Sequence, residues 1–253
     1  MSRHHILTGA CLLAAAVGAA ASPSVFIGID NGFKATPTNA NAARDGFLAA
    51  AGPVSVQDVE SLTPGPLGAS TTGVFANGVG VTLTNTTTAQ NSGAPGYLRI
   101  TQGDGGFSTY AAGGQKFLEA LSGRGSTFFT ATFDAPLSAI GMFITDLSDW
   151  AGTPGVPDLE MVLTTTDGQT LVFDPSGPLL TPTDLVDGNI AFFGVVGNDV
   201  AFTSFAVRIP QATPDGDALG FDNVMIRAAA VPEPGALALA GLGLAALTRR
   251  RRR

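Results

Sequence analysis

Short runs of apolar residues, separated by turn-forming residues, recur along the chain and predict an all-β protein. Within several runs apolar and polar side chains alternate, as they do on a strand with one buried face. Gly, Asn, Asp and Pro between the runs supply the turns. The predicted strands are residues 25–29, 54–59, 79–84, 97–100, 127–133, 137–145, 159–165, 169–173, 190–196, 202–209 and 219–226. The glycine-rich stretch 101–125 shows no clear period.

Two connections in this pattern are more specific. Asp167-Gly168 lies between two alternating runs and predicts a tight β-hairpin. Asp134-Ala135-Pro136 joins two other runs and predicts a proline corner between consecutive strands. About ten strands at this spacing are typical of an antiparallel β-sandwich.

One helix is predicted before the second strand. It begins at Thr38 or Asn39, either of which can cap it, and runs to about Ala51. Phe47 and Leu48 belong to its apolar positions, which recur at helical spacing. Farther along, the Thr-Pro-Gly-Pro sequence at 63–66 predicts a loop.

Residues 1–21 predict a secretory signal peptide that is absent from the mature protein. Arg3 precedes an apolar segment, 6–21, that is rich in Ala and Leu. The small side chains of 19–21 suit a signal peptidase, so Ser22 is the expected first residue of the mature chain.

The last segment, 231–253, has a different pattern. Two prolines in its first four residues end any regular structure that precedes them. A run without polar side chains, 235–247, then leads to Thr248 and five arginines, which keep their charge and stay on the cytoplasmic side of a membrane. The predicted signal residues are Val231, Pro232, Glu233, Pro234, Arg249, Arg250 and Arg251.

The apolar run is short for a permanent membrane span. Its 13 residues would form a helix of about 20 Å, against a hydrocarbon core of about 30 Å. A transient or cleavable anchor therefore fits better. The alternatives are a buried core helix and a basic nucleic-acid-binding tail, and the secretory N-terminus argues against the second.

The signal peptide, Val231-Pro232-Glu233-Pro234, the apolar run and the Arg-rich end together resemble the PEP-CTERM class of bacterial exported proteins. The resemblance implies a Gram-negative origin, transient inner-membrane insertion of a C-terminal hydrophobic helix and processing by an exosortase. It also implies a link to extracellular polysaccharide and biofilm. The same tail is sometimes labelled an ice-binding protein C-terminal domain.

The body, 22–230, is also similar to exported proteins of this class that have a jelly-roll sandwich. The segments that carry this similarity are 43–50, 56–60 and 218–224. It implies a galactose-binding-like or related carbohydrate-binding sandwich. The expected fold is therefore all-β, a jelly-roll-like antiparallel β-sandwich with one short N-terminal helix, a signal helix before it and a hydrophobic helix after it.

Without its two terminal signals the chain is strongly acidic. Arg3 and Arg249–Arg253 leave seven other basic residues against 20 acidic ones, a net charge of about −13. Such a charge disfavours nucleic acid as a partner. Cys11, His4 and His5 all lie in the signal peptide, so the mature protein has no disulfide, no Ser-His-Asp triad and no His-ligated zinc site.

Oxygen-bearing residues near strand ends form a candidate calcium site. Calcium takes about six to eight oxygen ligands. Asp30 and Asn31 follow the first strand and Asp222 lies in the last, which could place them together if those strands are neighbours. Asp146 and Asp149 form a second oxygen-rich patch, and neither patch has the spacing of an EF-hand. The alternative is that these residues form turns and caps.

Two further patterns concern carbohydrate. Trp150 and Tyr97 are candidate sugar-stacking residues, although Trp150 also fits simple packing at the edge of the sandwich. Asp158 and Glu160 would share one face of a strand and form a candidate carboxylate pair for glycoside hydrolysis, a spacing that is common by chance.

We therefore expect a non-enzymatic surface or extracellular-matrix protein of a Gram-negative bacterium. Its expected partners are a signal peptidase and an exosortase-type enzyme, and it is first anchored in the inner membrane. The alternative is a calcium-supported carbohydrate-binding module for exopolysaccharide. A carboxylate-only glycoside hydrolase is the third interpretation.

Overall fold

The computed structural model describes residues 22–74, 79–86, 96–106, 108–122, 127–147, 159–174, 188–208 and 217–230. The predicted signal peptide, 1–21, and the segment 231–253 lie outside these ranges, so the two terminal helices stay predictions. No helix in the described ranges is long and apolar enough to cross a membrane.

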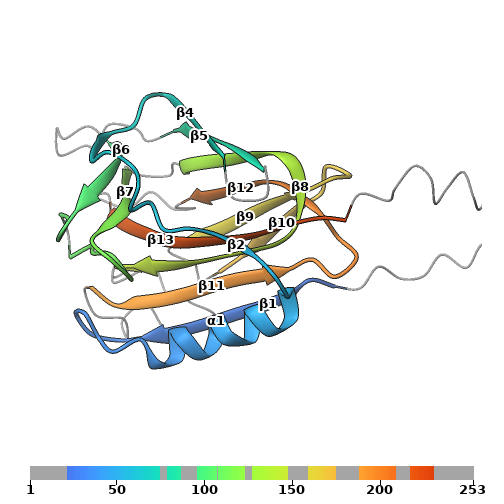
Figure 1. Ribbon diagram of the computed structural model, residues 1–253, viewed down its shortest axis with the longest axis horizontal. Helices are drawn as coiled ribbons and strands as arrows, with labels where there is room; N and C mark the ends of the chain where they lie inside the picture. Colours follow the sequence, from blue (N-terminus) through green and yellow to red (C-terminus); the bar gives the residue numbers. More distant parts are fainter. Residues whose placement is uncertain are drawn as a thin grey trace, which may run out of the picture.

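All strand pairs in the described residues are antiparallel, which confirms the predicted all-β class (Figure 1). One short helix accompanies them, α1 Thr38–Ala51. The strands are β1 Ser24–Asp30, β2 Ser55–Gln57, β3 Gly65–Pro66, β4 Ser70–Val74, β5 Gly80–Asn85, β6 Tyr97–Gln102, β7 Lys116–Ser122, β8 Thr127–Thr145, β9 Glu160–Thr165, β10 Thr170–Phe173, β11 Ile190–Val196, β12 Phe202–Arg208 and β13 Asp217–Ala228.

Strand β8 organises the sheet because its two halves have different neighbours. Residues 129–133 pair with β5, and residues 127–137 pair with β12. The second half, 139–145, pairs with β11 on one side and β13 on the other. The change of neighbours occurs at Asp134-Ala135-Pro136, where the sequence predicts a corner. The corner lies within one continuous strand of 19 residues.

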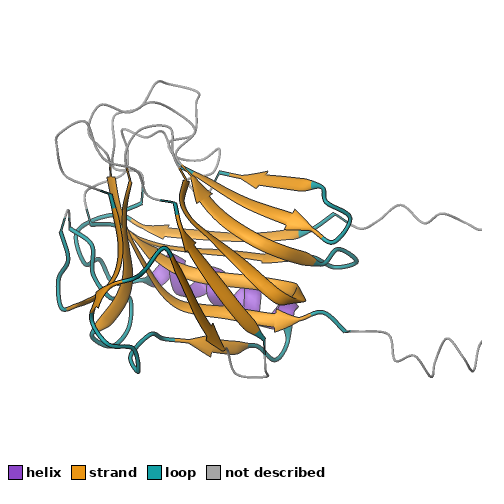
Figure 2. Cartoon of the chain, turned by 90° about the horizontal axis from the view of Figure 1, so that it is seen from above, coloured by secondary structure: helices purple, strands orange, loops and turns teal. Residues whose placement is uncertain are grey.

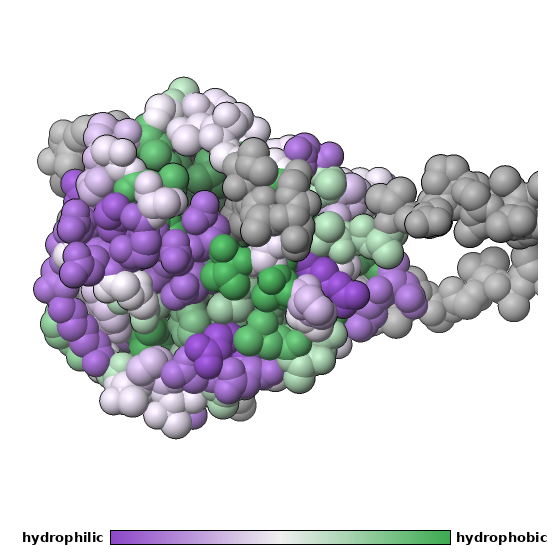
Figure 3. Space-filling view, in the orientation of Figure 1, coloured by the Kyte–Doolittle hydropathy of each residue, from purple (hydrophilic) through white to green (hydrophobic). Residues whose placement is uncertain are grey.

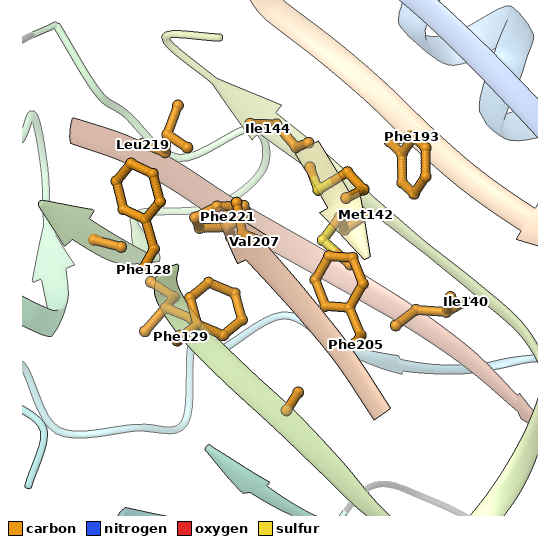
Figure 4. Close-up of a cluster of buried hydrophobic side chains, with 14 of the residues drawn as sticks. Phe128, Phe129, Ile140, Met142, Ile144, Phe193, Phe205, Val207, Leu219 and Phe221 are labelled. Atoms are coloured by element: carbon orange, nitrogen blue, oxygen red, sulfur yellow. The ribbon is translucent and has the colours of Figure 1, made fainter. Parts of the chain in front are cut away.

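The two halves of β8 carry two layers that share one apolar core. The first layer has the order β10-β9-β12-β8-β5-β4, and the second has β1-β11-β8-β13-β7-β6-β3, with β2 also on β13. Phe129 from the first layer packs edge-to-face against Phe221 from the second, with 5.1 Å between the ring centroids. Figure 4 shows these rings beside Phe205 and Met142. The body is therefore a β-sandwich-like fold.

Helix α1 covers the outer face of the second layer (Figure 2). Its N-terminus is capped by the carboxylate of Asp30, which accepts hydrogen bonds from the N–H groups of Asn39 at 3.0 Å and Ala40 at 2.9 Å. The predicted helix is confirmed, but its cap comes from the preceding strand rather than from Thr38 or Asn39.

A pair of glycines lets α1 approach the sheet closely. Gly141 on β8 lies directly opposite Gly194 on β11. The ring of Phe47 packs over this pair, and its centroid lies 5.6 Å from the centroid of the Phe192 ring. A Cβ at Gly194 would lie 2.7 Å from the Phe47 ring, closer than side-chain atoms tolerate.

Several strands differ from the prediction. The structure adds β4, which the sequence pattern did not indicate, and places β7 in the glycine-rich stretch that had no clear period. Strand β2 is shorter than predicted because Val59 has a positive φ of 55°, which ends the extended backbone. The predicted loop at 63–66 contains the two-residue strand β3. The hairpin across Asp167-Gly168 is confirmed as β9–β10.

Candidate functional site

The β6–β7 hairpin carries a fully buried carboxylate. Glu119 lies on β7, directly opposite Arg99 on β6. Its side chain has no exposed surface, whereas the Arg99 side chain is 38% exposed. Both Nε and Nη2 of Arg99 lie 2.7 Å from Oε2 of Glu119. The guanidinium that faces it across the hairpin offsets the cost of burying this charge.

Further donors surround the Glu119 carboxylate. The Tyr97 hydroxyl donates to Oε1 at 3.1 Å, and the Gly106 N–H donates to the same oxygen at 2.9 Å. The Thr101 hydroxyl donates to Oε2. Burial raises the pKa of the Glu119 carboxyl, but the hydrogen bonds from Arg99 and Thr101 outweigh burial and hold that pKa below its usual value. Glu119 is therefore ionised at neutral pH.

Tyr97, a predicted sugar-stacking residue, belongs to this network. The Arg99 guanidinium lies over its ring at 4.3 Å from the centroid, a cation–π arrangement. Burial, followed by the charge of Glu119, raises the pKa of the Tyr97 hydroxyl to about 12. Arg99 thus occupies one face of the ring, and a sugar could stack on that face only by displacing it.

Beside this network lies an open polar depression of about 550 Å³ at the loop end of the second layer. Gln102 and Gln115 meet on one wall, with Nε2 of the first 3.3 Å from Oε1 of the second. Lys34 pairs with Asp104 at 2.6 Å and lies 5.8 Å from the centroid of the Tyr110 ring. Amide, carboxylate, ammonium and aromatic groups therefore border one depression, a combination suited to hydroxyl-rich ligands.

The predicted calcium ligands are held apart by the sheet. Asp30 ends β1 and Asp222 lies in β13, and strands β11 and β8 lie between them. Convergence of Asp30 and Asp222 requires the first and last strands to be neighbours, and they are not. Asn31 is exposed in the loop that follows β1. Within the described ranges, no three His, Cys, Asp or Glu side chains form a cluster of the kind that holds a metal ion.

The described carboxylates of that set accept hydrogen bonds from backbone N–H groups. Asp146 follows β8 with a positive φ of 65°, and its Oδ1 accepts from the Gly188 N–H at 2.7 Å. Asp222 accepts from the Gly113 N–H at 2.8 Å and from the Asn223 N–H at 2.7 Å. These bonds agree with the alternative that the residues cap loops, and calcium binding stays a prediction.

The other predicted site residues are only partly described. Asp149, Trp150 and Asp158 lie outside the described residues. Glu160 forms an ion pair with Arg208 on the neighbouring strand β12. The signal residues Val231–Pro234 and Arg249–Arg251 also lie outside the described residues.

Sequence reasoning missed Arg99, Glu119 and the depression around Gln102 and Gln115. The alternation of Tyr97, Arg99 and Thr101 places three polar side chains on one face of β6 and was the available signal. Their partner could not be assigned because Glu119 interrupts the apolar pattern of β7.

Replacement of Arg99 tests the importance of the buried pair. We expect Arg99→Ala to lower the free energy of unfolding by about 3–5 kcal/mol, since it leaves Glu119 buried without its cationic partner. Arg208→Ala removes the matching partner of Glu160 from a more exposed pair and should cost less than about 1 kcal/mol. Urea unfolding at pH 7 measures both, and equal losses would contradict the assignment.

Asp222 predicts an unusual dependence of stability on pH. Burial raises the pKa of its carboxyl from 3.8 to about 6, with a further contribution from the charge of Glu60. Between these values the folded protein binds the proton more tightly than the unfolded chain does, so the contribution of Asp222 to stability falls as the pH rises. Replacement by Asn removes this loss.

We expect the free energy of unfolding of Asp222→Asn, relative to that of the wild type, to increase by about 1–3 kcal/mol as the pH rises from 4 to 7. Urea unfolding at several pH values measures this difference. The exposed Asp199, changed to Asn, is the control for the loss of one negative charge. A difference between Asp222→Asn and the wild type that does not change with pH would refute the prediction.

The comparisons with known proteins identify the C-terminal segment. Residues 230–253 match the family model of the PEP-CTERM protein-sorting motif. No curated protein matches the chain. The matched residues include the Val-Pro-Glu-Pro sequence, the apolar run and the arginines from which the sorting signal was predicted. The chain therefore carries a PEP-CTERM protein-sorting motif, which indicates an exported protein that is processed by an exosortase at the membrane.

Proposed function

We propose that this protein is a non-enzymatic component of the bacterial cell surface or extracellular matrix, delivered there by exosortase processing. The observation that carries the proposal is the sorting motif at 230–253, attached directly to an antiparallel β-sandwich-like body. In this proposal the body is a jelly-roll-like module that persists after both terminal signals have been processed.

The arrangement of the chain ends supports display at a surface. Ser24 pairs with Val196, which pairs with Ala139, and Ala139 pairs with Arg227. The start of β1 and the end of β13 therefore lie at the same end of the body (Figure 1). Attachment through the C-terminal segment would leave the opposite end, with its polar depression, facing outward.

The chemistry of the body supports a non-enzymatic role. Its sequence from Ser22 onward contains neither His nor Cys. Glu119 is ionised and enclosed by donors, and Glu60 accepts hydrogen bonds from the N–H groups of Gln115 and Lys116. Carboxylates held in this way tie loops to the sheet and are poorly placed to transfer protons to a substrate.

The processing step is testable by mass spectrometry of the exported protein. In cells that contain the exosortase, we expect the wild type to have lost its C-terminal segment, including Arg253. Glu233→Ala removes the only carboxylate of the sorting motif and should leave the chain intact to Arg253. The exposed Asp199, changed to Ala, should be processed like the wild type. An exported wild-type chain that still ends in Arg253 would overturn the proposal.

A second candidate function is binding of exopolysaccharide, favoured by the polar depression at the outward end of the body. The side chains of Gln102 and Gln115 present amides that hydrogen-bond to sugar hydroxyls. Calcium held by loop carboxylates at the same end would support this binding. A third candidate, glycoside hydrolysis by carboxylates such as Glu160, would shorten the polysaccharide rather than retain it.

Retention on immobilised exopolysaccharide tests the second function. We expect binding by the wild type in calcium, a loss of about tenfold with EDTA, and a similar loss in a Gln102→Ala, Gln115→Ala double variant. Thr170→Ala, on the distant edge strand β10, should bind normally. Binding that is indifferent to both changes would remove this candidate. Shortened polysaccharide would point to hydrolysis instead.

A further inference from the structure

The core of the sandwich contains an apolar cavity beneath the β4–β5 hairpin. Its volume is about 130 Å³. Val81, Phe129 and Phe133 line it from the first layer, and Ile100, Leu118 and Phe221 line it from the second. The cavity is therefore a space between the two layers, built by strands that are far apart in the sequence.

The cavity occupies only one side of the core. On the side of β9 and β11 the core is closed, and Leu163 and Phe193 have no exposed surface. Near the β4–β5 hairpin, Val81 close to the start of β5 and Leu118 in β7 each retain 6% of their surface. The two layers thus pack fully on one side and diverge on the other.

An opening connects this space to solvent. Leu62, which is 38% exposed, lines the cavity together with Thr71, Thr72 and Gly73 of the edge strand β4. A Cβ added at Gly73 would meet no atom within 4 Å, so the opening is not blocked there. Figure 3 shows apolar surface in the hollow below the hairpin.

The lining defines the chemistry of a ligand. An apolar cavity of this size can accept small apolar molecules, as an engineered cavity of about 150 Å³ does. None of the described residues that line it is charged. Thr71 and Thr72, with the amide of Gln57, place hydrogen-bonding groups among the lining residues, two of them at the opening. A charged group inside would lose its hydration without a partner.

We propose that this cavity binds the alkyl chain of a neutral, single-chain amphiphile. The chain lies between the layers, and the uncharged polar end stays at the opening near Thr71 and Thr72. The net negative charge of the body disfavours an anionic amphiphile such as a fatty acid. This site is separate from the polar depression and does not depend on the proposed function.

Unbranched primary alcohols are suitable probes for calorimetric titration. The exported protein is purified without detergent, because detergent would compete for the cavity. We expect saturable binding of 1-hexanol at one site per chain. From 1-butanol to 1-hexanol the affinity should rise about fourfold for each added CH₂ group. Hexanoate at pH 7 should bind at least about tenfold more weakly than 1-hexanol.

Two substitutions at the opening test the location. Gly73→Leu and Thr71→Leu each place an apolar side chain at the opening and should weaken 1-hexanol binding by about tenfold or more. Thr170→Leu adds the same side chain to the opposite edge of the same layer and should leave binding unchanged. Thermal unfolding of each variant checks that the fold is retained.

Three results would overturn the proposal. The first is the absence of saturable alcohol binding, including the case in which only xenon binds, since that would make the cavity a packing void. The second is unchanged binding in both Gly73→Leu and Thr71→Leu. The third is equal affinity for hexanoate and 1-hexanol, which would exclude a preference for neutral ligands.

Discussion

Strand β8 hydrogen-bonds to four other strands, and this sharing determines how the two layers meet. Its first half pairs with β5 and β12, and its second half pairs with β11 and β13. Because one continuous backbone belongs to both layers, neither layer can slide relative to the other without breaking the pairings on β8. This constraint brings Phe129 against Phe221 and closes the core on one side. The apolar cavity lies where the layers diverge on the other side.

Buried and half-buried carboxylates attach the loops to this framework. Asp30 holds the start of α1, Glu119 holds the loop at Gly106, and Asp222 holds the loop at Gly113. Glu60 binds the start of β7 in the same way. The chain from Ser22 onward has no cysteine, and these contacts provide its long-range connections between loops and strands. An acidic protein thus uses its carboxylates as internal acceptors as well as surface charges.

Whether a prediction from the sequence was correct depended on how far apart in the sequence the interacting residues lie. The β9–β10 hairpin and α1 were predicted because a tight turn and a helical period are local patterns. Strand β7 was missed because Glu119 occupies a position where an amphipathic strand is expected to be apolar, and only Arg99 on β6 makes that burial acceptable. The proposed meeting of Asp30 and Asp222 failed because β11 and β8 lie between their strands, which no local pattern reveals.

The sequence by itself determined the sorting motif of this protein, its acidic charge, its all-β class and the absence of His and Cys from Ser22 onward. A sorting signal is read as a linear segment, and charge and residue types are properties of composition. The tertiary structure alone decided which residues share a site. The Glu119 network, the depression beside Lys34 and the cavity beneath β4 each combine residues from distant segments. Their positions depend on strand order and register, which result from the packing of the whole chain.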